Sequence, residues 1–228
     1  MHRSYLTLRY ILIGFMLIFF FNGCAVYNEF FGESPEEKMP EELMRDGLEK
    51  MERGYYEGAT EAFQALKDRY PYDKYAVVAE LKMADSLYMT SAFDAAYDAY
   101  DEFERLHPKD RNIPYVIYQK GMCNFRQVKS IDRDQSYTLK AKDEFERLVK
   151  RFPRDDYTNN ARKNIRGCLQ YLAEHELSVG RFYFKMGKYR AAMERYIYII
   201  KNYPDMGQYH EALEYLHKCK AKLAEEEK

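Results

Sequence analysis

One spacing of small, aromatic and proline residues recurs along this chain, and it limits the fold more than any other feature. In GKYRAAMERYIYIIKNYP, residues 187–204, a glycine is followed by an aromatic, an alanine, a second aromatic and a proline at steps of 2, 3, 4 and 8. The same steps recur in residues 54–71 and, starting from a serine, in residues 91–108; the last two steps recur in residues 141–153. Four copies of one short unit predict a stacked array, because a single copy could not bury its own apolar face.

Each copy follows another helix-periodic segment that carries a small residue at a fixed place. Gly47, Ala84 and Gly180 lie seven positions before the glycine or serine, and Gly121 takes this role in the third copy, where the turn is longer. Two helices with a small residue at their crossing, an aromatic wedge and a closing proline are typical of the tetratricopeptide repeat. No useful run alternates with period two. The predicted fold class is therefore all-α, a tetratricopeptide-repeat superhelix of about four helix pairs.

The repeats differ in length, which predicts where the stack departs from regularity. Prolines 153 and 204 are 51 residues apart, and the stretch DDYTNNARKNIRGCLQYLAEHELSVGRFYFKMG between them contains no plausible helix break, so we expect one long helix of about 30 residues that bridges two repeats. Ser34 and Pro35 resemble the start of a helix. The predicted domain covers residues 35–224, with repeats at about 40–71, 75–108, 112–153 and 155–204 and a capping helix at 206–224.

The first residues have the pattern of an export signal that ends at a lipid-modified cysteine. A short basic start precedes the apolar run of 12 residues from Tyr10 to Phe21, which is too short to span a bilayer comfortably, where about 20 residues are needed. Gly23-Cys24 then resembles a lipobox, so we predict a signal peptide at 1–23, lipidation of Cys24 and a tether at 24–34. Ala25 after the cysteine resembles the sorting rule for the outer membrane. The alternative is an uncleaved anchor with an incidental cysteine.

Composition and charge argue against several classes of function. The formal net charge is −1, or −3 after loss of Arg3 and Arg9 with the signal, so nucleic acid is not an expected partner. Cys123, Cys168 and Cys219 lie in helical patterns and are expected to be small buried apolar residues rather than a disulfide framework. We expect no enzyme activity, no metal and no cofactor apart from the acyl groups on Cys24.

The spacing of the histidines does not predict a metal site. His210 and His217 are seven residues apart near Cys219, but a metal site needs closer geometry and a third ligand. No nucleophile elbow, phosphate-binding loop or dinucleotide fingerprint occurs.

The first helices of a tetratricopeptide stack line its concave surface, and here the predicted positions are mostly apolar. Exposed apolar side chains of this kind suit the binding of extended or helical peptides. The alternative is that a neighbouring helix fills the groove. The predicted groove residues are Met44, Leu48, Met51, Val78, Leu81, Tyr88, Tyr115, Tyr118, Met122 and Phe125. In the fourth repeat the corresponding region is more charged, and we predict a docking face for a partner protein at Arg181, Phe184 and Lys185, with a solvated helix face as the alternative.

Longer stretches of the sequence resemble one particular family. The runs ALKDRYPYDKYAVVAELKMADSLY, HPKDRNIPYVIYQKGM, DRDQSYTLKAKDEFERLVKRFP and LAEHELSVGRFYFKMGKYRAA are similar in order and spacing to the BamD family, the lipoproteins of the outer-membrane β-barrel assembly machine. The extra turn with Asp132-Arg133-Asp134 is informative, because a generic tetratricopeptide protein has no reason to lengthen it. The chain departs from the family where it closes after a single helix, which puts a complete final repeat in doubt.

The resemblance implies a location and a set of partners. It implies a lipid-anchored protein on the periplasmic face of the outer membrane. Its carboxy-terminal repeats would bind the periplasmic domains of the barrel-shaped assembly subunit, and its amino-terminal repeats would receive the carboxy-terminal signal of unfolded barrel proteins. Other assembly lipoproteins are also implied as partners.

Two other readings of the sequence stay open. One is a lipidated tetratricopeptide scaffold for secretion, pilus assembly or cell division. The other is a periplasmic enzyme with a helical repeat domain, against which the absence of a second domain argues.

Overall fold

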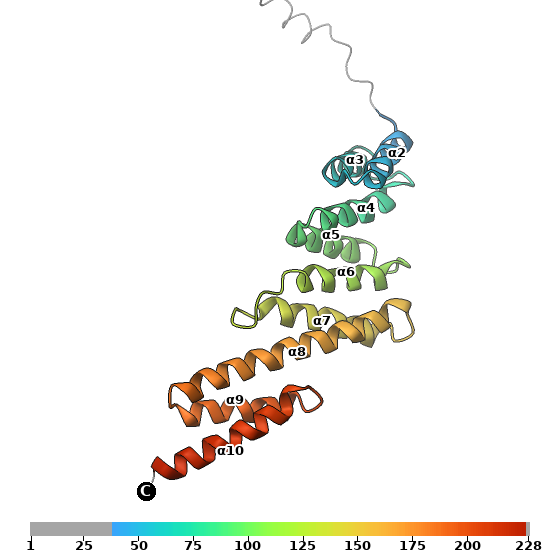
Figure 1. Ribbon diagram of the computed structural model, residues 1–228. Helices are drawn as coiled ribbons and strands as arrows, with labels where there is room; N and C mark the ends of the chain where they lie inside the picture. Colours follow the sequence, from blue (N-terminus) through green and yellow to red (C-terminus); the bar gives the residue numbers. More distant parts are fainter. Residues whose placement is uncertain (1–37, 227–228) are drawn as a thin grey trace, which may run out of the picture. The chain divides into compact units, whose positions relative to one another are not determined.

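The computed structural model describes residues 38–226 and shows a run of helices in antiparallel order (Figure 1). The described residues contain no β-strand. The predicted signal peptide, Cys24, the tether and the Ser34–Pro35 helix start lie outside this range. The helices are α2 (Pro40–Glu52), α3 (Tyr56–Arg69), α4 (Ala76–Met89), α5 (Phe93–Leu106), α6 (Ile113–Phe125), α7 (Ser136–Arg151), α8 (Asp156–Lys185), α9 (Tyr189–Asn202) and α10 (Gln208–Glu226).

Each helix packs against the next one along the chain, as the predicted repeat unit requires. The pairs α2–α3, α4–α5, α6–α7 and α8–α9 correspond to the four sequence copies, and α10 packs on α9 and α8. The all-α tetratricopeptide prediction is confirmed. The long bridging helix is also confirmed, because α8 runs for 30 residues without a break. Its first half packs on α7 and its second half on α9 (Figure 1).

The contact between a small residue and an aromatic ring holds each pair together. A Cβ atom added to Gly47 would lie 2.4 Å from Phe63 Cε1, and one added to Gly180 would lie 2.6 Å from Tyr196 Cε1. Both rings are fully buried. In the pairs that carry glycine, the aromatic ring therefore lies against the backbone of the preceding helix, at a distance that only glycine allows, whereas Ala84 takes this place in the second pair.

The turn inside each pair explains the glycine or serine that begins the repeated spacing. Gly54, Ser91 and Gly187 have φ values of +74°, +64° and +71°. This left-handed region suits glycine and strains most other residues. The third pair has no such residue because its longer turn, residues 126–135, is held instead by the buried side chain of Gln135. Its amide nitrogen donates to the carbonyl oxygens of Ser130 and Arg133.

The turns between pairs carry a second repeated device, an aspartate two residues after the proline. The carboxylates of Asp73, Asp110 and Asp155 each accept a hydrogen bond from the backbone N–H two residues further on, at 2.8, 2.7 and 2.9 Å. Aspartate in this position replaces a backbone turn and opens the next helix. Met206 occupies the equivalent place before α10.

A buried lysine joins α5, α6 and α7. The ammonium group of Lys120, on a side chain only 4% exposed, lies within salt-bridge distance of Asp101, Glu104 and Glu144. Arg147 binds Glu104 and Glu144 from α7. Burial alone would raise the pKa of Glu104, but hydrogen bonding and charge from Arg147, with Lys120, outweigh it and lower that pKa.

Replacing the glycine at a helix crossing should destabilise the fold, whereas replacing a glycine elsewhere on the same helix should not. Gly180→Ala is expected to reduce the free energy of unfolding by about 1–3 kcal/mol, because the new methyl group overlaps the Tyr196 ring. Gly167→Ala is the matched control on α8. Its Cβ would lie 3.7 Å from Phe125 Cζ, so alanine should stabilise the helix by up to about 1 kcal/mol. Urea unfolding followed by circular dichroism measures both, and equal effects of the two substitutions would contradict the prediction.

Candidate peptide-binding site

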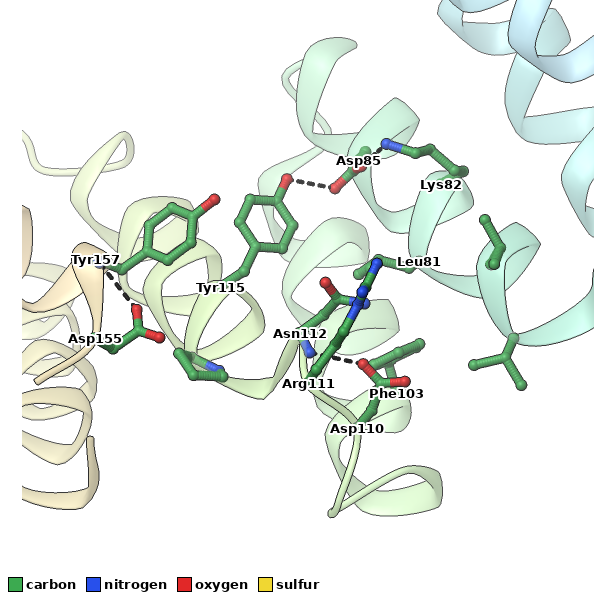
Figure 2. A pocket seen from close by; sticks show the side chains of 13 residues that line it. Leu81, Lys82, Asp85, Phe103, Asp110, Arg111, Asn112, Tyr115, Asp155 and Tyr157 are labelled. Atoms are coloured by element: carbon green, nitrogen blue, oxygen red, sulfur yellow. Dashed lines mark hydrogen bonds and ion pairs between the residues drawn. The ribbon is translucent and has the colours of Figure 1, made fainter.

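The main candidate site is a cavity of about 480 Å³ between α4, α6 and the start of α8 (Figure 2). Each of these elements is the first helix of a repeat or the turn that leads into it, so the cavity lies on the face that tetratricopeptide stacks use for binding. Its lining combines an apolar wall with charged and polar groups. The lining residues are Val77, Val78, Leu81, Lys82, Asp85, Phe103, Asp110, Arg111, Asn112, Pro114, Tyr115, Asp155 and Tyr157.

A buried carboxylate organises the floor of the cavity. Asp85 is 9% exposed and accepts hydrogen bonds from the hydroxyl groups of Tyr100 and Tyr115, at 2.8 and 2.7 Å. The ammonium group of Lys82 lies 3.0 Å from its other oxygen. Burial, together with the charge of Asp85, raises the pKa of both tyrosines, so both remain protonated donors. Asp85 therefore fixes the relative position of α4, α5 and α6 beneath the cavity.

Arg111 supplies a cation that the fold itself does not use. It comes from the turn between α5 and α6, is exposed, and has no carboxylate partner among residues 38–226. Its guanidinium group points from the turn toward Leu81 (Figure 2). By contrast, the two aspartates of the turns that line the cavity, Asp110 and Asp155, cap backbone N–H groups. A guanidinium beside an apolar wall can bind a carboxylate that follows a large apolar side chain.

The predicted groove residues lie in different environments in the structure. Val78, Leu81 and Tyr115 line the cavity. Leu48, like Val78, is substantially exposed. Met51 packs against the core that α2, α3 and α4 share, and the Tyr88 ring contacts Phe93 with ring centroids 5.4 Å apart.

Met44 corrects the prediction, because it is only 8% exposed and belongs to the core. Its side chain packs with Leu43 and Phe63 between α2 and α3, so it does not line a groove. In the first repeat, at least one position predicted to face the concave surface therefore faces the core instead.

In the third repeat the neighbouring helix α8 covers much of the predicted groove. Tyr157 of α8 lies 5.3 Å from the rings of both Tyr115 and Tyr118. The amide of Asn164 contacts Met122 Sδ at 3.3 Å, and Phe125 packs against Phe145. The alternative of a filled groove therefore describes Tyr118, Met122 and Phe125.

The predicted docking face of the fourth repeat is mostly engaged within the chain. Arg181 forms ion pairs with Glu174 at 3.2 Å and with Glu211 of α10 at 2.6 Å. The Phe184 ring lies 5.3 Å from both Tyr189 and Tyr215. Lys185 alone of the three is exposed. The capping helix α10 thus covers surface that the sequence had assigned to a partner.

Sequence reasoning missed Lys82, Arg111, Asn112 and Tyr157 as members of the site. All four lie outside the positions predicted to be concave. Lys82 follows Leu81 on α4, and the turn HPKDRN, residues 107–112, and the start of α8 bring the other three to the cavity. The available signal was the turn before α6, in which Asp110 accepts a hydrogen bond from the backbone N–H of Asn112 and an arginine, Arg111, follows it.

Other kinds of site find no support in the described part of the chain. Within residues 38–226, no three histidine, cysteine or acidic side chains are placed to hold a metal ion. None of the helices in that range combines the length and the apolar character needed to cross a membrane. Cys123, Cys168 and Cys219 are free and buried, and burial raises the pKa of the Cys123 thiol to about 12.

Removing the Asp85 carboxylate should destabilise the protein more than removing either tyrosine hydroxyl. Asp85→Ala is expected to cost about 2–4 kcal/mol, because it leaves the Tyr100 hydroxyl buried without an acceptor and Lys82 without its ion pair. Tyr100→Phe should cost about 1 kcal/mol. Denaturant unfolding of the two single variants and the double variant measures the coupling, and simple additivity would contradict the role given to Asp85.

Comparison with known proteins places this structure in a family. The profile of the YfiO family, described as "Outer membrane lipoprotein", matches residues 36–228. The outer membrane protein assembly factor BamD of Rickettsia prowazekii is 30% identical over 161 residues, covering 71% of this chain and 64% of that protein. BamD of Caulobacter vibrioides is 29% identical, covering 78% and 58%, so the chain spans about three fifths of the length of these two relatives. BamD of Neisseria meningitidis serogroup B is 30% identical, covering 80% and 72%.

A solved structure of low sequence similarity also aligns with the chain. The TPR2AB domain of yeast Sti1, in its pHSP90 complex, is 15% identical with a TM-score of 0.46, covering 81% of this chain and 71% of that one. The matches to the YfiO profile and to the BamD proteins confirm the sequence resemblance over most of the chain. The chain belongs to the YfiO family of outer membrane lipoproteins, whose relatives include the assembly factor BamD.

Proposed function

We propose that this protein is a lipid-anchored scaffold of the outer-membrane β-barrel assembly machinery. In this proposal Cys24 carries the acyl groups and holds the helical stack on the periplasmic face of the outer membrane. The protein performs no catalysis and needs no cofactor besides that lipid. Family membership carries the proposal, because relatives at about 30% identity are outer membrane protein assembly factors.

The cavity between α4, α6 and α8 is the proposed receptor for unfolded client proteins. A client segment that ends in an aromatic residue offers an apolar ring and a terminal carboxylate. The ring would lie against Val78 and Leu81, and the carboxylate would bind Arg111 and Lys82. The exposed Leu48 lies on the predicted concave face of the first repeat and would extend the binding surface for residues further from the end of the client.

The second half of the stack is the proposed attachment point for the barrel-shaped assembly subunit and for other assembly lipoproteins. Of the residues first predicted for this role, Lys185 is exposed, whereas Arg181 and Phe184 are engaged by α10. The exposed side chains Phe182 and Met186 at the end of α8 add apolar surface there.

Loss of the free cation should weaken client binding without changing stability. Arg111→Gln is expected to raise the Kd for a fluorescent ten-residue peptide that ends in phenylalanine by about tenfold, because one charge-assisted contact is lost. Lys109→Gln is the matched control, since Lys109 is an exposed cation of the same turn but does not line the cavity. Fluorescence anisotropy measures both variants. If the peptide amide binds as tightly as the free acid, the carboxylate role of Arg111 is wrong.

The cellular role should be visible in the membrane fraction. Affinity purification of the chain from solubilised outer membranes is expected to recover a large β-barrel protein in stoichiometric amount. Cys24→Ser should move the chain into the soluble periplasmic fraction, because the acyl anchor is lost. Depletion that leaves barrel proteins assembled but blocks secretion, pilus formation or septation would refute the proposal.

A further inference from the structure

The middle of α8 borders a second cavity, of about 310 Å³, that the client site does not use. Gly167, Gln170, Tyr171 and Glu174 of α8 line it, together with Ile131 of the long α6–α7 turn and Gln208 at the start of α10. It shares no residue with the cavity between α4 and α6. A partner at this place is therefore a separate matter from client binding, and either can fail without the other.

The cavity exists because α8 changes its buried face halfway along its length. The first half buries Thr158, Ala161 and Cys168. The second half buries Ala173, Leu177 and Gly180, which lie on a different side of the helix at 100° per residue. The part of the α8 surface that neither half buries lies between two neighbours. One is the α6–α7 turn, where His175 Nδ1 contacts the Ile131 carbonyl oxygen, and the other is α10.

The groups around the cavity carry an excess of acceptors and negative charge. Glu174 is the only carboxylate in the lining, and no lysine or arginine lines it. Arg181 is shared between Glu174 and Glu211, so this group of three side chains has a net charge of −1. The side-chain N–H of Gln208 donates a hydrogen bond to Glu174 at 2.9 Å. The Oε1 atom of Gln208 is buried and has no hydrogen-bond partner in the described structure. The lining itself supplies no positively charged donor, and Arg181 reaches Glu174 Oε1 from outside the lining.

Aromatic and apolar side chains lie beside this acceptor group. Tyr171 lines the cavity and is 41% exposed, and Phe182 and Met186 are 59% and 58% exposed. Steps of 11 and 4 residues place these three side chains on one face of α8. A guanidinium or ammonium group in the cavity could contact the face of the Tyr171 ring, which favours cations. Apolar residues of the same ligand would then continue along Phe182 and Met186.

We propose that this cavity binds an arginine or lysine side chain of a partner protein, and that apolar residues next to that side chain dock on Tyr171, Phe182 and Met186. The carboxylate of Glu174 and the amide oxygens of Gln170 and Gln208 would receive its N–H groups. Two irregular features of the stack form this site. The long turn of residues 126–135 supplies Ile131, and the long helix α8 supplies four of the lining residues.

The test uses the full chain in detergent, with labelled methyl groups of Ile131 and Met186 observed by NMR. The probe is a capped seven-residue peptide with a central arginine, three alanine or leucine residues on each side and leucine at both ends. We expect saturable shifts of both methyl signals with this peptide. A peptide with glutamate in place of the arginine should leave the Ile131 signal unmoved.

Two variants separate the cavity from the surrounding surface. Gly167→Leu places a side chain at the edge of the cavity without a backbone clash, since the nearest atom to its Cβ would be Phe125 Cζ at 3.7 Å. It should abolish the Ile131 shift without lowering the unfolding midpoint. Glu174→Gln should raise the Kd about tenfold, whereas Glu61→Gln, an exposed acid on α3, should not. Equal binding of the arginine and glutamate peptides, or an Ile131 shift that survives Gly167→Leu, overturns the proposal. So does an Ile131 shift that depends only on protein concentration, because a second copy would then occupy the cavity.

Discussion

In three of the four helix pairs of residues 38–226 an aromatic ring lies against the backbone of a glycine, and the rest of the stack depends on this contact. Phe63, Phe145 and Tyr196 each lie where a Cβ atom of Gly47, Gly121 or Gly180 would have to be. The contact fixes both the distance and the rotation of the two helices, because ring and glycine meet at one register only. Once the pairs have this geometry, the first helix of each later pair packs on the second helix of the pair before it.

The surface of the first helices is not uniform, and its variation separates structure from binding. In the third repeat, Tyr157 and Asn164 of α8 take up the aromatic surface, so the rings there serve packing. Between α4 and α6 a cavity remains, beside an arginine that forms no ion pair within residues 38–226. At the other end, α10 neutralises Arg181 and encloses Phe184. Two surfaces are left for ligands. One is the cavity between α4 and α6, where a turn separates the helices, and the other is the cavity beside α8, where the buried face of that helix changes.

The sequence predicted the architecture well because the architecture rests on local rules. The positions of Gly54, Ser91 and Gly187 follow from a backbone conformation, and the aromatic positions follow from helical period, so both appear in the sequence as fixed spacings. The cavity residues could not be predicted in this way. Arg111 matters because no carboxylate of the described residues pairs with it, and Met44 fails as a groove residue because it is buried in the core that α2 and α3 share. The ion pairing of an arginine and the burial of a methionine both depend on residues distant in the chain, which the spacing of apolar residues along a helix does not reveal.

The unbroken course of α8 has a consequence for cooperativity. In a regular array each repeat meets its neighbour across a turn, and stability approximates a sum of repeat terms and interface terms, so the ends can fray independently. Here α8 is at once a partner of α7 and a partner of α9. Residues 136–202 therefore have no boundary at which one unit could open while the next stays folded. The carboxy-terminal half should unfold as one block, with the amino-terminal pairs as the separable units.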